Sequence, residues 1–112
     1  MHEVIEIIQN DGAGDLSVAI EPWGMPLRLA AGHAFRVVAR GPTPGQLEVV
    51  RRPGAITVYA WPGATAEVFD GEQLVERFSQ PVPAVPPGQT VRAFFGLLGL
   101  DSDRRNHGVD RP

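Results

Sequence analysis

The residue types that most often bind metals or form nucleophiles are few in this chain and lie far apart. The 112 residues include no cysteine and three histidines, His2, His33 and His107. Disulfides, thiolate ligands and cysteine nucleophiles are therefore excluded. His33 is followed by Ala34 and Phe35, so the closely spaced histidines of a cupin-type metal site are absent. We expect no bound metal and no other cofactor.

Two pairs of acidic residues could in principle act as a general acid and a general base. These pairs are Asp70 with Glu72 and Glu67 with Glu76. All four flank one predicted tight turn, where carboxylates are usually solvated charges, and no neighbouring element suggests a cleft around them. The serine and threonine side chains have no base implied beside them. The sequence therefore favours a protein that is not an enzyme.

A glycine-rich stretch at residues 12–14 resembles part of a phosphate-binding loop. Asp11 and Asp15 flank it directly, and two carboxylates at that place would repel a phosphate. We interpret the stretch as a connection between two strands.

A group of aromatic and basic residues is the remaining candidate for a binding surface. Tyr59 and Trp61 alternate along one predicted strand, and Arg36 and Arg40 share one face of another. Aromatic and arginine side chains dominate interface hot spots, and exposed aromatic rings also stack on sugars and bases. These four residues could bind a carbohydrate or another small ligand. The alternative is that both faces of the strand are covered, in which case Tyr59 and Trp61 belong to the core.

The elements that must position these residues are short apolar runs rich in β-branched residues, each ended by Gly, Pro, Asn or Asp. This pattern predicts an all-β fold, a single antiparallel β-sandwich or small barrel of about seven or eight short strands. The runs cover residues 4–8, 16–20, 33–39, 47–51, 55–61, 66–69 and 74–78. At this length the chain forms one domain that needs no disulfide or metal to fold.

Alternation and turn residues predict how some strands pair. Residues 4–8 and 16–20 form a first hairpin through residues 10–15, and residues 66–69 and 74–78 form a last hairpin around Asp70 and Gly71. Residues 52–55 carry proline and glycine at the two central positions of a type II turn. Phe35, Val37 and Ala39 are expected to face the core. Trp23, between Pro22 and Gly24, is expected to close one end of the barrel.

The composition changes after residue 79. Residues 1–79 form the β domain, residues 80–89 a proline-rich linker, residues 90–100 an apolar docking segment and residues 101–112 a polar tail. The docking segment places apolar residues at helical spacing, at Val91, Phe94, Phe95 and Leu98. Leaving these side chains in water would be costly. Since the prolines favour an extended path, we expect docking on a second copy or another protein, with folding back on the same domain as the alternative.

The charge and the N-terminus narrow the class of partner. With 13 acidic and 10 basic residues the formal charge is −3, which offers no electrostatic footprint for nucleic acid or for an anionic membrane. Residues 1–8 show no signal peptide, and no apolar run approaches the length of a membrane span. These features favour a cytoplasmic protein.

Several short motifs lie between residues 21 and 63. They are Glu21-Pro22-Trp23-Gly24, Leu27-x-Leu29-x-x-Gly32, Gly41-Pro42, Leu47-Glu48-Val49 and Ile56-Thr57-Val58-x-Ala60-Trp61-Pro62-Gly63. The set resembles short uncharacterised bacterial β-proteins, which implies a compact β fold and a bacterial source but assigns no function. We therefore expect a non-catalytic protein-binding or assembly module, a homo-oligomer or part of a larger complex, that docks through its C-terminal arm. The alternative is a carbohydrate- or small-ligand-binding β domain.

Overall fold

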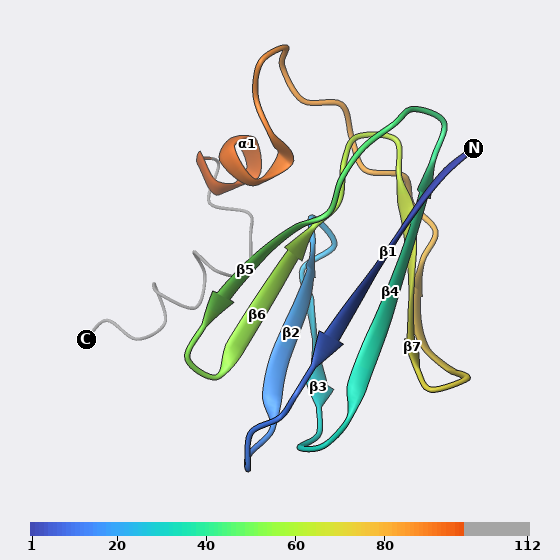
Figure 1. The fold of residues 1–112 in the computed structure, drawn as a ribbon. Coiled ribbons are helices and arrows are strands. Elements are labelled where there is room, and N and C mark those ends of the chain that lie inside the picture. Colours follow the sequence, from blue (N-terminus) through green and yellow to red (C-terminus); the bar gives the residue numbers. More distant parts are fainter. Residues whose placement is uncertain (98–112) are drawn as a thin grey trace.

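The computed structural model describes residues 1–97 and shows eight strands, followed by one short helix, in two four-stranded sheets (Figure 1). The first sheet has the order β1-β4-β7-β8 and the second the order β3-β2-β6-β5. The element bounds are β1 His2–Gln9, β2 Leu16–Glu21, β3 Met25–Leu29, β4 Ala34–Gly41, β5 Glu48–Arg52, β6 Ala55–Tyr59, β7 Thr65–Asp70, β8 Gln73–Phe78 and α1 Val91–Leu97. The predicted all-β sandwich is confirmed.

Strand pairing differs from the sequence prediction in two respects. β1 and β2 do not form a hairpin, because β1 pairs with β4 in one sheet while β2 lies between β3 and β6 in the other. The pairing of β2 with β6 is parallel, so the second sheet is mixed rather than antiparallel. The connection at residues 10–15 therefore carries the chain from one sheet to the other. A short polar loop fits both a hairpin and such a crossing, and only the side chains that each strand must bury distinguish the two.

The core lies between the inner faces of the two sheets. Phe35, Val37 and Ala39 on β4 are at most 2% exposed, as their alternation predicts. Val18 and Ile20 on β2 are fully buried and face them from the other sheet. Burying one apolar side of each sheet against the other is what holds a sandwich together.

The predicted turns at residues 52–55 and 70–71 are confirmed. Gly54 has a φ of 76° and Gly71 a φ of 62°, a backbone region that glycine enters without steric cost. The first turn joins β5 to β6, and the second joins β7 to β8 with a register shift after Val68.

Aromatic packing covers the end of the sandwich where β2 and β8 finish. Trp23 stacks on Phe78 with their ring centroids 5.0 Å apart, and its indole N–H donates to the carbonyl oxygen of Gln80 at 2.8 Å. Trp23 is half-buried, so this arrangement agrees with its predicted role in closing one end.

The proline-rich segment does not lead the chain away from the domain. Val82 is 3% exposed; its N–H donates to the oxygen of Ala64 at 2.9 Å and its oxygen accepts from the N–H of Gly63 at 2.8 Å. Figure 1 shows the chain continuing over that end of the sandwich and placing α1 beside the start of β5 and the end of β6. Within residues 1–97 no helix has the length and hydropathy to span a membrane.

Candidate functional site

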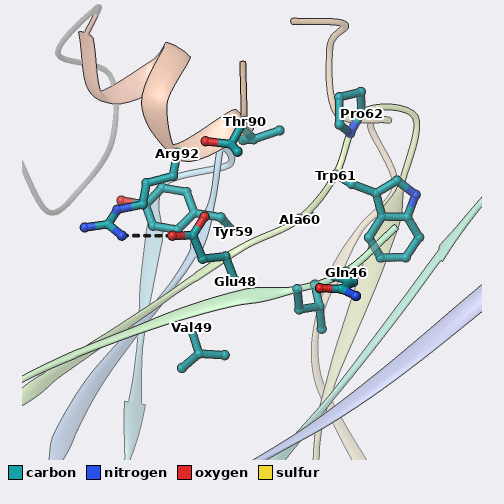
Figure 2. A pocket seen from close by; sticks show the side chains of 11 residues that line it. Gln46, Glu48, Val49, Tyr59, Ala60, Trp61, Pro62, Thr90 and Arg92 are labelled. Carbon is teal, nitrogen blue, oxygen red and sulfur yellow. Dashed lines mark hydrogen bonds and ion pairs between the residues drawn. The ribbon is translucent and has the colours of Figure 1, made fainter. Parts of the chain in front are cut away.

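A pocket of about 550 Å³ lies where β5, the end of β6 and the start of α1 meet. Figure 2 shows Tyr59 beside the ion pair of Glu48 and Arg92, whereas Trp61 lies on the other side of the same segment. Arg92 Nη1 and Glu48 Oε2 are 2.8 Å apart. The volume falls within the range of small-molecule sites, which is roughly 300–1,000 Å³.

The two aromatic residues of this pocket are not exposed. Tyr59 is 2% and Trp61 is 7% exposed, so the predicted open surface for stacking on a sugar does not exist, and both side chains belong to the core. The sequence alternative in which both faces of the strand are covered is the correct one. Tyr59 and Trp61 nevertheless line the pocket with part of their side chains.

Trp61 is held by the connection between β4 and β5. Its indole N–H donates to the oxygen of Thr43 at 3.0 Å. A Cβ atom added at Gly45 would lie 2.1 Å from Trp61 Cγ, and one added at Gly41 would lie 2.9 Å from Trp61 Nε1. Glycine is therefore required at residue 45 because the ring packs directly on the backbone.

Arg36 and Arg40 do not take part in a site with these aromatics. Both belong to β4 in the first sheet, whereas Tyr59 ends β6 in the second. The guanidinium of Arg36 lies over the ring of Phe69, 4.6 Å from its centroid, a cation–π contact. The predicted ligand surface made of all four residues is therefore wrong, since its members are divided between two sheets.

Four exposed apolar residues that the sequence reasoning missed lie on the two edge strands of the first sheet, whereas Met25, at 48% exposure, lies on β3 of the second. Ile5 is 52% exposed and Ile7 is 50% exposed on β1, and Leu74 and Val75 on β8 are 38% and 39% exposed. Register places Ile7, Arg36, Phe69 and Leu74 in one row across the four strands. The name outer-face patch is used below for Ile5, Ile7, Phe69, Leu74 and Val75. The sequence held a signal for this exposed surface. Neighbouring residues of a strand point to opposite faces, so the consecutive apolar residues at 4–5 and 7–8 in β1 and at 74–75 in β8 indicate apolar side chains on both faces.

A row of alternating charges crosses the same face beside the patch. Arg40 donates from Nε to Glu3 Oε2 at 2.7 Å and from Nη1 to Glu67 Oε1 at 3.0 Å, and Arg77 Nε donates to Glu67 Oε2 at 2.8 Å. Hydrogen bonds from Arg77 and then Arg40 lower the pKa of the Glu67 carboxyl from its usual value, and those to Glu67 and Glu3 raise the pKa of Arg40. Two acids and two bases leave this row without net charge.

The remaining polar candidates form ordinary surface contacts. His33 Nδ1 lies 3.0 Å from Asp70 Oδ2, and the His33 side chain is 53% exposed. Glu67, one of the acids considered for catalysis, is occupied by the two arginines. In the part of the chain that the structure describes, no three His, Asp or Glu side chains are grouped closely enough to hold a metal ion.

The predicted docking segment is placed on its own chain where the structure describes it. Val91 is 4% exposed within the core, and Phe94 is half-buried against that core. The expected contact of Val91 with a second subunit is thus replaced by an intramolecular one, because the chain after Val82 turns back instead of extending. Phe95 lies in α1, but its side chain is outside the description. Leu98 and the tail at 101–112 lie outside the described residues.

Comparison of the chain with models of known protein families, with curated proteins and with solved structures finds no match. The candidate site therefore rests on its geometry.

Proposed function

We propose that the protein is a non-catalytic protein-interaction module that docks through the outer-face patch. The observation that carries this proposal is a row of partly exposed side chains across one face of the first sheet, from Ile5 and Ile7 on β1, past Arg36 and Phe69, to Leu74 and Val75 on β8. Contiguous exposed apolar surface rimmed by polar groups is characteristic of protein interaction sites.

The chemistry around the patch favours a protein as the partner. The neighbouring row of Glu3, Arg40, Glu67 and Arg77 has no net charge, so it supplies neither a phosphate-binding surface nor an attraction for an anionic membrane. An apolar centre with a polar, charge-balanced rim is the usual anatomy of a protein–protein interface. Arg36, whose guanidinium lies over the Phe69 ring, adds the residue type that is enriched in such interfaces.

Photo-crosslinking tests this function without knowledge of the partner. Benzoylphenylalanine is placed at Leu74 in the patch and, as the control, at Arg28 on the second sheet, whose side chain is 78% exposed. Irradiation in the source cells should give a defined protein adduct from position 74 and none from position 28. The same products from both positions, or none from position 74, would refute the proposal.

A second candidate function is small-ligand binding in the pocket beside Tyr59. The observation that favours it is a cavity of about 550 Å³ lined by Tyr59, Trp61 and the Glu48–Arg92 pair. The chain has two tryptophans, so a Trp23→Phe variant leaves Trp61 as the single indole reporter. Saturable quenching of its fluorescence by a member of a glycan panel, lost in Arg92→Ala, would support this function. Fluorescence titrations of the Trp23→Phe protein that are the same with and without Arg92→Ala would contradict it.

A further inference from the structure

Part of the outer face of the second sheet is buried, although the first sheet packs against the opposite face. The residues of β2 that alternate with Ala19 and Glu21 face the core, so these two side chains point outward. Register places Thr57 beside Ala19 and Tyr59 beside Glu21 on the same face. All four residues are at most 5% exposed. The name covered face is used below for these four residues.

The burial ends at the next row of the same sheet. Ser17 on β2 lies opposite Arg28 on β3 and beside Ala55 on β6. Ser17 and Arg28 are exposed, and Ala55 is half-buried. This row has the exposure usual for the solvent side of a sheet. A local cover must therefore lie over the covered face and stop before this row.

The helix α1 reaches the covered face at one corner. Arg92 in its first turn pairs with Glu48, which lies opposite Tyr59 on the sheet (Figure 2). The seven residues of α1 span only about 10 Å, so Leu97 stays close to this corner. Residues 98–112 can span about 50 Å when extended, whereas four strands are together only about 15 Å wide. The segment that follows α1 is therefore long enough to cross the sheet.

We propose that residues 98–112 are the cover, folding back over the second sheet and burying Leu98 and Leu100 against Ala19 and Thr57. Both leucines lie in the first part of the segment, close to the corner where α1 meets the sheet. Apolar side chains gain stability when a neighbouring surface removes them from water. The cover belongs to the sheet opposite the outer-face patch, so this inference does not rest on the proposed function.

Glu21 adds a charge that the segment is suited to pair. Its side chain is fully buried, and a buried carboxylate is stable only when hydrogen bonds or an opposite charge compensate for the lost water. The segment carries two adjacent arginines, Arg104 and Arg105, and arginine binds carboxylates through two parallel hydrogen bonds. In the proposed arrangement one of these arginines pairs with Glu21.

Photo-crosslinking within the purified full chain tests the location of the segment. Val50 is half-buried on β5 and lies opposite Thr57. Benzoylphenylalanine at position 50 should give an intrachain adduct that tandem mass spectrometry assigns to a residue beyond Leu97. The variant with this group at Leu74, on the first sheet, is the control and should give no such adduct. The absence of this adduct from position 50, or the same adduct from both positions, would overturn the inference.

A single cysteine at Thr57 tests what covers the face, because the chain contains no other cysteine. Thr57→Cys should react slowly with a thiol reagent. Adding Leu98→Asp and Leu100→Asp should raise the rate at least about tenfold by local opening, while the strands keep their cooperative melt. Ser102→Asp with Asn106→Asp adds the same charge without removing an apolar side chain, and should leave the rate within about twofold. Equal rates in the two variants would overturn the inference.

A double-mutant cycle tests the ion pair on the same reporter. Replacing Arg104 and Arg105 by glutamine should raise the reactivity of Thr57→Cys. The increase should disappear when Glu21→Gln is also present, because the carboxylate is then no longer available to the arginines. An equal increase with and without Glu21→Gln would refute the pairing of Glu21 with the segment.

Discussion

Adding one methyl group at Gly45 should destabilise the protein strongly. The Cβ atom of Gly45→Ala would lie 2.1 Å from Trp61 Cγ and 2.4 Å from Trp61 Cδ1. Carbon atoms in contact are normally about 3.5–4.0 Å apart, so either the backbone of the 41–45 connection or the indole ring has to move. The ring is 7% exposed and is hydrogen-bonded to Thr43, which leaves it little freedom.

The expected loss in the free energy of unfolding is the sum of two costs. Overpacking a core costs about 1–3 kcal/mol, and breaking the indole hydrogen bond adds roughly 0.5–1.5 kcal/mol. We therefore expect a loss of about 3 kcal/mol in the free energy of unfolding. For a domain of this size 1 kcal/mol corresponds to about 4–8 °C in Tm, so the expected decrease in Tm is roughly 12–24 °C.

Gly14→Ala is the matched control for this substitution. Gly14 has no atom within 4 Å of the added Cβ, and neither Gly14 nor Gly45 has a positive φ. The control should therefore be nearly neutral, or more stable by up to about 1 kcal/mol through the lower entropy of its unfolded chain. Circular dichroism melts of the three proteins provide the measurement. A Gly45→Ala melt within about 2 °C of the Gly14→Ala melt would refute the packing of Trp61 described above.

Three further substitutions test the core, the charge row and the C-terminal contact. Val37→Asp should abolish the cooperative melt because it places a charge at a fully buried position, whereas Val75→Asp, at 39% exposure, should keep it. The pKa of Glu67 is lowered in the folded state, so its ionised carboxyl stabilises the protein above its unfolded pKa, and this stability is lost as the pH falls through the folded pKa. Glu67→Gln should therefore flatten the dependence of Tm on pH in the acid range. The effect should be clearest at low salt. Val91→Asp should remove hydrogen-exchange protection from α1 while the strands remain protected, since Val91 at 4% exposure anchors the helix.

Local patterns predicted the strands, and non-local packing decided their partners. The alternation of Phe35, Val37 and Ala39 identified the buried face of β4, and glycine identified the turn at Gly54. Both features depend only on neighbouring residues. The parallel pairing of β2 with β6 joins segments about forty residues apart, and nothing in the polar connection at 10–15 distinguishes it from a hairpin.

The candidate site was predicted less well because its residues are covered by distant segments. The alternation predicted that Tyr59 and Trp61 share one face of a strand, but β6 ends at Tyr59 and the two side chains lie on opposite sides of the segment (Figure 2). It could not show that the 41–45 connection packs on Trp61, or that Arg92 of α1 reaches Glu48. The prolines at 81–87 suggested an extended arm, yet the backbone bonds of Val82 to Gly63 and Ala64 turn that arm back onto the domain.

The apolar residues of β1 divide into two sets with different consequences. Ile8 is fully buried and Val4 is half-buried against the core, so these two residues stabilise the single domain. Ile5 and Ile7 point the other way and remain half exposed, and a threonine at either position would supply comparable strand propensity while exposing less apolar surface. Their benefit to an isolated copy is therefore small. Under the proposed function, burial against a partner would give them a stabilising effect that grows with the concentration of that partner, because only the associated form gains that contact.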